Sequence, residues 1–380
     1  MSNQPSAPER GKRLHSLDAL RGFNMLWIIG AEGIADALSG LNFPGARMVA
    51  SQLDHAAWIG FTFNDLIFPL FLFLVGVALA FSVKKRRDQG HDIGKLLRRI
   101  VVRTVLLYLL GVYVSNSGFI LRGWFYNLRW TGVLSRIAIC YCISALLVLF
   151  TKPRVQVGVF VGLLVGYWLV LRWVPVPGFG AGVWTPEGNL ANYIDRQYLP
   201  GRLYYQTWDP EGLISTFAAI ATCLLGTFTG YWLQLQGEWR GRPLGKGRKA
   251  SYLVLIGLVL IGAGLLWSLD FPIIKKIWTS SYVLLTGGLS LILMALFYWL
   301  IDIKHWRQWA FPFTVIGMNS IFIYITADTF PFFATAKWLV GGAQFGFLGA
   351  WQPLAVATAV LTLEWLVLYV MYRRKIFIRL

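Results

Sequence analysis

One histidine of this sequence lies beside residues that could support catalysis. Of the four histidines, His55 lies in SQLDHAAWIGFTFNDLIFP, just before a long apolar stretch, whereas the others lie among basic residues. Asp65 follows it in the same segment, and Glu32 lies near the end of the preceding apolar stretch. Histidine titrates near neutral pH, and a carboxylate can orient its ring and stabilise the imidazolium. His55, Glu32 and Asp65 are therefore the candidate catalytic residues.

Each of these residues also has a simpler interpretation. A single histidine is more often structural than catalytic, Asp65 could cap the helix that follows it, and Glu32 could pair with another helix. A metal site would need three or four ligands, and the sequence contains no spacing signature such as HExxH. No metal is therefore predicted.

Further polar residues interrupt or border apolar stretches. Arg136 in GVLSRIAICY lies roughly two turns inside one such stretch, which predicts a buried partner. Asp209 and Glu211 in TWDPEGLIST precede another, where helix capping is the favoured interpretation and binding of a substrate the alternative. Asn319 in GMNSIFIY is a third candidate for substrate binding, or else a contact between helices.

The elements that must position these residues are membrane helices. Hydrophobic residues make up 57% of the 380 positions and charged residues 14%, far from the average of about 45–50% and 25% in soluble domains. Apolar runs approach the roughly 20 residues that a helix needs to cross a bilayer, and they do not alternate as barrel strands do. The runs predict about ten spans, at approximately 20–38, 60–83, 100–115, 129–150, 155–174, 211–233, 251–268, 279–301, 308–326 and 351–372.

The basic residues predict the orientation of these spans. The net charge is +18, but the dense clusters at Lys84–Arg87, Arg98–Arg99, Arg240–Lys249 and Arg373–Lys375 all fall on one side of a ten-span topology. This asymmetry is typical of cytoplasmic segments and does not indicate a nucleic-acid partner. We expect an all-α, polytopic membrane protein with both termini in the cytoplasm, residues 1–15 being a tail and 16–380 one transmembrane domain. Residues 331–349 could add a short or re-entrant helix, for up to eleven.

The sequence resembles the transmembrane acetyltransferase family of heparan-alpha-glucosaminide N-acetyltransferase and its bacterial homologues. The resemblance covers nearly the whole chain and depends on segments that occur in one order. They are SLDALRGF at 16–23, HAAWIGFTFNDLIFPLFLFLVG at 55–76, GVLSRIAICY at 132–141, TPEGNLANYIDR at 185–196, DPEGLIST at 209–216, KKIWTSSYVLLTGG at 275–288, GMNSIFIY at 317–324 and LYVMYRRKIF at 368–377.

This resemblance implies an enzyme that transfers acetyl groups from cytoplasmic acetyl-CoA to an amino sugar across the membrane. The family's catalytic histidine lies in a motif like HAAWIG, which assigns that role to His55. Inner-face basic residues would bind the phosphates of the donor. The candidates are Arg136, Arg98, Arg99, Arg103, Lys152 and Arg248. Glu32 stands where the animal enzyme has an asparagine, and the family's additional N-terminal luminal domain is not expected here.

The resemblance also implies a bacterial inner membrane, surrounding lipids and a possible homodimer. The acceptor sugar, and the choice between an acetyl-histidine intermediate and direct transfer, stay open. Two alternative functions remain: a transporter for sugars or amino sugars, and an O-acyltransferase acting on envelope polysaccharide. Consumption of a thioester would separate the enzymes from a transporter, and an amide or ester product would separate the two enzymes.

Overall fold

The structure, a computed structural model, describes residues 14–120, 127–239, 242–327 and 329–378. Most of the expected tail at 1–15 and Arg240 of the basic cluster therefore lie outside the described residues. The longer helices are α1 (His15–Ser39), α3 (Phe63–Leu79), α5 (Ile93–Ile120), α6 (Val133–Phe150), α7 (Pro153–Trp173), α9 (Ser215–Gln234), α10 (Lys246–Trp267), α11 (Ser280–Phe297) and α15 (Gln352–Arg373).

Shorter elements connect them. They are the helices α2 (Pro44–Leu53), α4 (Lys85–Asp88), α8 (Leu190–Tyr198), α12 (Phe311–Met318), α13 (Ser320–Thr326) and α14 (Phe332–Val340), two π-helical turns at Ala80–Lys84 and Tyr298–Ile303, a 3₁₀ segment at Ala343–Trp351, and the two-residue strands β1 (Glu238–Trp239) and β2 (Arg242–Pro243). The strands pair antiparallel. The all-α prediction is thus confirmed apart from this small hairpin.

Eight segments of the described chain are long and apolar enough to cross a membrane. They are Phe63–Asp88, Ile93–Ser117, Val133–Phe150, Pro153–Trp173, Ser215–Gln234, Lys246–Trp267, Ser280–Ile303 and Ala343–Arg373. Each contains at least 18 residues, close to the number that a helix needs to cross a bilayer core. The chain is therefore a multi-pass helical membrane protein.

Two of the ten predicted spans do not meet these criteria. The first corresponds to α1, which has 25 residues but whose apolar sequence is interrupted by charged residues such as Asp18, Arg21 and Glu32. The second corresponds to α12 and α13, which are separated at Asn319 and have only eight and seven residues. The count of ten spans therefore stays a prediction.

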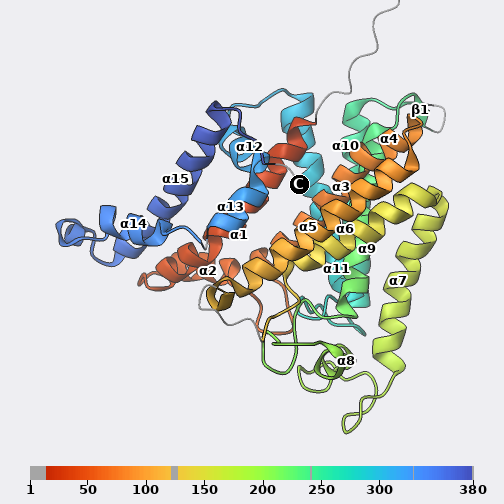
Figure 1. The fold of residues 1–380 in the computed structure, drawn as a ribbon, viewed down its shortest axis with the longest axis horizontal. Helices are drawn as coiled ribbons and strands as arrows, with labels where there is room; N and C mark the ends of the chain where they lie inside the picture. Colours follow the sequence, from red (N-terminus) through yellow and green to blue (C-terminus); the bar gives the residue numbers. More distant parts are fainter. Residues whose placement is uncertain (1–13, 121–126, 240–241, 328, 379–380) are drawn as a thin grey trace, which may run out of the picture.

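The region around 331–349 contains a short helix. α14 has nine residues, and the 3₁₀ segment that follows it has nine more. At about 1.5 Å per residue, α14 is too short to cross a bilayer. α14 packs against α15 beside the main bundle (Figure 1).

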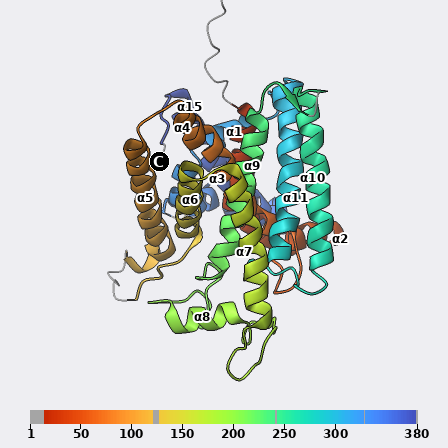
Figure 2. The same cartoon turned by 90° about the vertical axis from the view of Figure 1, so that its right-hand side faces the viewer.

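The connecting elements lie at two opposite ends of the helical bundle. Figure 1 shows α4 and β1 at the end of the molecule where α1 begins, and α2 and α8 at the opposite end. The 90° view in Figure 2 shows the same separation. Segments rich in lysine and arginine, such as Lys84–Arg87, thus lie at the end opposite to α2, which directly precedes His55.

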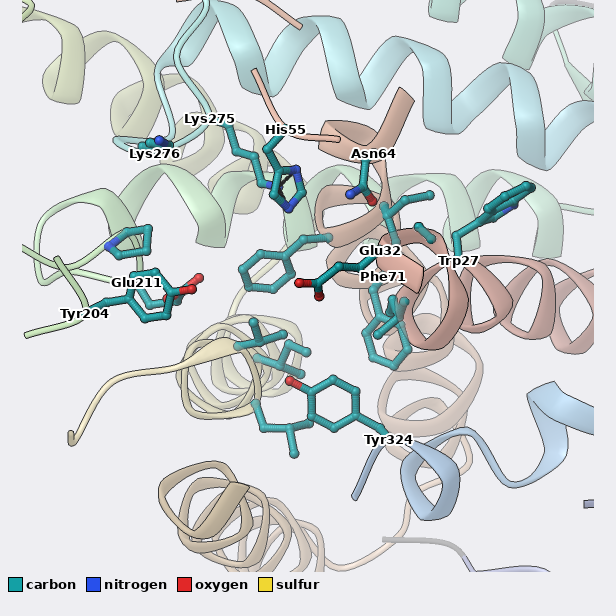
Figure 3. A pocket seen from close by; sticks show the side chains of 18 of the residues that line it. Trp27, Glu32, His55, Asn64, Phe71, Tyr204, Glu211, Lys275, Lys276 and Tyr324 are labelled. Atoms are coloured by element: carbon teal, nitrogen blue, oxygen red, sulfur yellow. Dashed lines mark hydrogen bonds between the residues drawn. The ribbon is translucent and has the colours of Figure 1, made fainter. Parts of the chain in front are cut away.

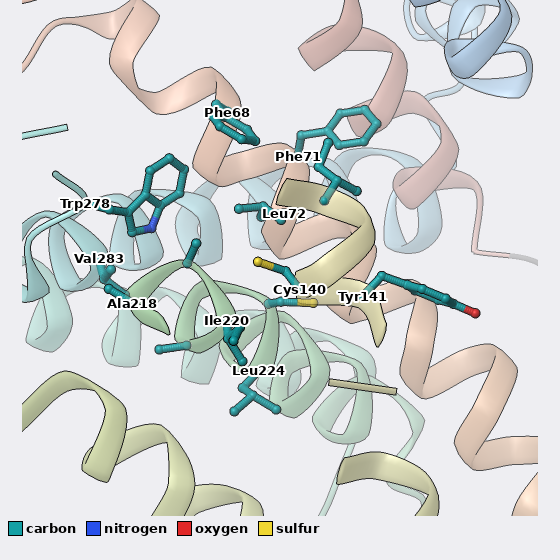
Figure 4. Close-up of a cluster of buried hydrophobic side chains, with 14 of the residues drawn as sticks. Phe68, Phe71, Leu72, Cys140, Tyr141, Ala218, Ile220, Leu224, Trp278 and Val283 are labelled. Atoms are coloured by element: carbon teal, nitrogen blue, oxygen red, sulfur yellow. The ribbon is translucent and has the colours of Figure 1, made fainter. Parts of the chain in front are cut away.

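The centre of the bundle depends on close contact between α3 and α9. A Cβ added at Gly76 would lie 1.8 Å from the Cys223 carbonyl oxygen, and one added at Gly226 would lie 1.9 Å from that of Phe73. Small residues allow membrane helices to approach closely in this way. Apolar side chains of α3, α6, α9 and α11 fill the space around this crossing, with Trp278 at its edge (Figure 4). The N-terminal end of α3, which follows His55, is therefore held on a rigid base.

Candidate active site

His55 lies in a short connection between two helices. α2 ends at Leu53, with Asp54 as its C-cap, and α3 begins at Phe63 with Thr62 as its N-cap. The backbone N–H of His55 donates a hydrogen bond to Asp54 Oδ1 at 2.7 Å. The connection thus holds the histidine at the N-terminal end of α3, with its side chain half exposed.

Asp65 links the histidine to the helix. Its Oδ1 lies 2.9 Å from His55 Nδ1, and its Oδ2 accepts hydrogen bonds from the backbone N–H groups of Ala56 and Thr62 at 3.2 and 3.1 Å. Thr62 and Asp65 form a capping box, in which each side chain bonds to the other's backbone. The capping of α3 by Asp65 is therefore confirmed, and the same carboxylate also reaches His55.

This contact determines which ring nitrogen of His55 is available. The Asp65 carboxylate is 1% exposed and only accepts hydrogen bonds when ionised, so Nδ1 carries the proton that it receives. The lone pair of the neutral ring then resides on Nε2. This is the arrangement that an imidazole needs to act as a base or as a nucleophile.

A lysine that the sequence analysis did not select completes this group. Lys275 lies in the loop between α10 and α11, and its Nζ is 2.9 Å from His55 Nδ1 and 3.2 Å from Nε2. The same Nζ is 3.3 Å from Asp65 Oδ1. Burial lowers the pKa of Lys275, while the carboxylates of Asp65 and Glu211 act in the opposite direction. His55, Asp65 and Lys275 are called the His–Asp–Lys group below.

The His–Asp–Lys group opens into a cavity of about 530 Å³ through His55 and Lys275. Glu32 lines the same cavity, and Figure 3 shows its carboxylate directed into the space below the His55 ring. Tyr204 and Tyr205 line it as well. The structure therefore brings His55 and Glu32 to one cavity, with Asp65 buried behind His55, although the catalytic roles of all three stay a prediction.

A second, smaller cavity of about 90 Å³ lies deeper along the bundle. Arg21 and Arg103 line it, and the Arg103 guanidinium stacks 4.7 Å from the Tyr141 ring centroid. The two cavities share four lining residues, Phe71, Leu134, Ile137 and Ile321. Of the six basic residues predicted to bind a donor, Arg103 is the one that lines either cavity.

The other predicted donor contacts lie elsewhere. Arg98, Arg99, Lys152 and Arg248 are exposed and line neither cavity. Arg136 is buried behind the cavity wall, with Nη2 2.5 Å from Ser215 Oγ and its guanidinium 5.1 Å from the Trp278 ring centroid. The buried hydrogen-bond partner of Arg136 is thus a hydroxyl group, where a carboxylate or the donor was expected. Donor binding by these residues remains a prediction.

Asp209 and Glu211 form an ion cluster with Arg129. Arg129 Nε and Nη2 each lie 2.7 Å from an oxygen of Asp209, and Nη2 lies 2.5 Å from Glu211 Oε2. Burial opposes the charge on Arg129, but the two carboxylates outweigh it and raise the pKa of the guanidinium. Arg129 and Glu211 line the cavity of the His–Asp–Lys group, whereas Asp209 is buried behind it.

The capping interpretation of Asp209 and Glu211 is wrong. α9 begins at Ser215 rather than at 211, and its N-cap residue, Ile214, makes no side-chain cap. Asn319 likewise lies outside both cavities: its amide donates to the Ile376 carbonyl at 3.0 Å and its oxygen accepts from the Ile378 N–H at 2.9 Å. The structure thus gives Asn319 a contact with the C-terminal segment, and substrate binding by it stays a prediction.

Fold and site together define a class: a helical membrane protein with an imidazole suited to proton or acyl transfer in an internal cavity. Residues 13–194 match the family model described as heparan-alpha-glucosaminide N-acetyltransferase, catalytic. Heparan-alpha-glucosaminide N-acetyltransferase of Homo sapiens is 27% identical over 414 residues, which cover 96% of this chain and 59% of the relative. The enzyme of that name from Mus musculus is 26% identical, covering 96% and 60%.

These matches confirm the resemblance to the heparan-alpha-glucosaminide N-acetyltransferase family. The chain spans about 59% of the length of the human relative. The family-model match includes Glu32, His55, Asp65 and Arg129, whereas Glu211 and Lys275 lie beyond its end.

Proposed function

We propose that this protein is a transmembrane acetyltransferase that moves an acetyl group from cytoplasmic acetyl-CoA to the amine of a glucosamine-type sugar on the other side of the membrane. The observation that carries the proposal is the His55–Asp65 pair, at 2.9 Å, on a cavity inside a multi-pass helical protein. The relatives named N-acetyltransferases support the choice of reaction.

The two cavities suit a donor that enters from the end with the basic segments. Acetyl-CoA carries several phosphate charges at one end of a long thin arm, and arginine is well suited to bind phosphate. Arg21 and Arg103 line the inner cavity, and the apolar residues shared by both cavities, such as Phe71, lie between them and His55. Small movements at these shared residues would let the arm deliver its acetyl group to the histidine.

The outer part of the larger cavity suits an amino sugar. Tyr204 and Tyr205 line it, and such rings combine an apolar body with a polar tip. Glu32 and Glu211 place carboxylates in the same space and would attract the ammonium group of the acceptor. Glu32 is our candidate for removing the proton that makes this nitrogen nucleophilic.

The chemistry then depends on Nε2 of His55. This atom either accepts the acetyl group from the thioester and passes it to the amine, or removes a proton from the amine as it attacks the thioester directly. Asp65 holds the ring in the required tautomer and compensates positive charge that develops on it. Both routes need the same ring orientation.

The deciding experiment uses the purified full chain in sealed vesicles with known orientation. Labelled acetyl-CoA is supplied on the side of the basic segments, and a membrane-impermeant glucosamine derivative on the other, with galactosamine and glucose as comparison acceptors. We expect a hydroxylamine-stable amide on the amino sugar only in this arrangement. Uptake of intact sugar without thioester consumption would identify a transporter, and a hydroxylamine-labile product would identify an O-acyltransferase.

A further inference from the structure

The Lys275 ammonium lies unusually close to the reacting ring. Its Nζ is within 2.9 Å of His55 Nδ1 and 3.2 Å of Nε2, and it lies 3.3 Å from Asp65 Oδ1. The side chain is 19% exposed, and that exposed part faces the cavity (Figure 3). The loop before α11 therefore delivers one mostly desolvated cation to the place where His55 would meet an acyl group.

The hydrogen bonds around the ring leave part of this ammonium free. Nδ1 donates its proton to Asp65, so it has no lone pair for Lys275, and the acceptors within reach are Nε2 and the Asp65 carboxylate. Once Nε2 binds a proton or an acyl carbon, it no longer accepts a hydrogen bond. One N–H of Lys275 is then available to donate a hydrogen bond to a carbonyl oxygen that becomes negatively charged beside Nε2.

Other donors next to the histidine have hydrogen-bond partners away from its ring. The backbone N–H of His55 donates to Asp54, and that of Ala56 donates to Asp65. The neighbouring Lys276 donates to the Ala57 carbonyl at 2.7 Å, and Asn64 donates to the Leu53 carbonyl at 2.8 Å. In the described part of the chain, Lys275 is the cation within hydrogen-bond distance of the His55 ring.

Acyl transfer at this position generates a negative oxygen. When a nitrogen lone pair attacks the thioester carbonyl, a C–N bond forms and the carbonyl π electrons move onto oxygen. Collapse of this tetrahedral intermediate restores the C=O bond, breaks the C–S bond and releases the thiolate. Donors that are already directed at the developing oxyanion are commonly the largest single contribution to such catalysis.

We propose that Lys275 is a catalytic residue that stabilises the oxyanion of the tetrahedral intermediate. The inference rests on the proposed acetyltransferase function, and it applies both to acetyl-histidine formation and to direct transfer. The competing role is structural, in which Lys275 only compensates the buried charge of Asp65. A purely structural role predicts lost stability with kcat retained in the folded protein, whereas oxyanion stabilisation predicts lost kcat with intact binding of the donor.

Lys275→Met tests the proposal, with Lys276→Met as its matched control. Removal of one oxyanion donor typically lowers kcat by about 10²–10³-fold. We expect that loss for Lys275→Met, with an unchanged KM for acetyl-CoA and less than roughly a tenfold loss for Lys276→Met. Equal losses of kcat in the two variants, or a kcat of Lys275→Met within threefold of the wild type, would overturn the proposal.

Two further measurements separate catalysis from structure. A donor analogue with an anionic methylphosphonyl group in place of acetyl should bind Lys275→Met about 10²-fold more weakly, while a planar ketone analogue binds it as it binds the wild type. Lys275→Cys treated with 2-bromoethylamine, which restores an amine at the same length, should regain kcat. If Lys275→Met does not fold, the alkylated Lys275→Cys protein provides the test instead. Equal weakening of both analogues, or no rescue, would contradict the oxyanion role.

A negative result for the role of Lys275 can be distinguished from a failure of the proposed acetyltransferase function. A wild-type protein that consumes no thioester with any amino sugar would overturn the acetyltransferase proposal itself. An active wild type with an equally active Lys275→Met would overturn only the role of Lys275.

Discussion

Replacement of Asp65 by asparagine separates the two contacts that this carboxylate makes. Oδ2 accepts from two backbone N–H groups and from the Thr62 hydroxyl at 3.2 Å, whereas Oδ1 faces His55 and Lys275. An asparagine keeps one oxygen, and the capping side offers more donors to it. The amide NH₂ would therefore face His55 and donate to Nδ1, which moves the ring proton to Nε2 and removes the reactive lone pair.

The expected loss of activity is large. In a serine-protease triad, loss of the carboxylate that sets the histidine tautomer lowers kcat by about 10⁴-fold. We expect Asp65→Asn to lower kcat by roughly 10³–10⁴-fold in the acetyl-CoA and glucosamine assay. The broken Asp65–Lys275 pair should also cost stability. Loss of one partner of a buried ion pair costs about 3–5 kcal/mol, and the partial exposure of Lys275 reduces this to roughly 2–3 kcal/mol.

Thr62→Ala is the control for the capping function. It removes the N-cap hydroxyl, with its hydrogen bonds to Asp65 Oδ2 and the Asp54 carbonyl, but not the Asp65 Oδ1 that contacts His55, so it should cost about 1 kcal/mol of stability with kcat within threefold of the wild type. Turnover is measured on purified protein, and stability as the melting temperature in the same detergent. An Asp65→Asn protein that loses stability but retains kcat within threefold would refute the tautomer argument.

Three further predictions concern other parts of the molecule. Glu32→Gln should lower kcat by about 10²–10⁴-fold at unchanged stability, and a loss below threefold would assign Glu32 a structural role. Burial raises the pKa of Asp195 from 3.8 to about 7, so the folded state binds its proton more tightly than the unfolded state. The neutral carboxyl group of Asp195 therefore contributes about 4 kcal/mol to the free energy of unfolding below pH 4, and this contribution is lost as the pH rises to about 7. The melting temperature should therefore fall over this range and fall less in Asp195→Asn; parallel curves would contradict this. Gly226→Ala should lower the melting temperature, because the added Cβ would lie 1.9 Å from the Phe73 carbonyl oxygen. Gly158→Ala, in open space on α7, is the control and should not lower it. Equal melting temperatures of the two variants would refute the close packing of α3 and α9.

The sequence was sufficient to predict features that depend on nearby residues. The apolar runs predicted most of the long helices, and eight of them are present as candidate spans. His55 and Asp65 lie within one short segment, so their separation already suggested that a carboxylate could orient the ring. The breaks were harder to predict, because a run such as 308–326 is mostly apolar and a polar residue such as Asn319 does not by itself show that the helix is divided there.

Contacts between distant segments could not be predicted in this way. Lys275 is separated from His55 by 220 residues, and Arg129 from Asp209 by 80 residues. One signal could have identified both basic residues: they lie on the side of the predicted topology where lysine and arginine are scarce, so orientation does not explain them. The start of α9 at Ser215 was missed because turns that precede a helix can contain the same residues as a helix start.

The central claim is that His55 carries the transfer chemistry, and His55→Ala tests it most directly. The side chain is half exposed but bonds to the buried Asp65 carboxylate, so its removal should cost roughly 1–3 kcal/mol of stability. The account predicts that the purified variant stays folded and keeps its affinity for the planar donor analogue, yet transfers no detectable acetyl group to the amino sugar. Turnover within tenfold of the wild type in a folded, donor-binding variant would contradict it.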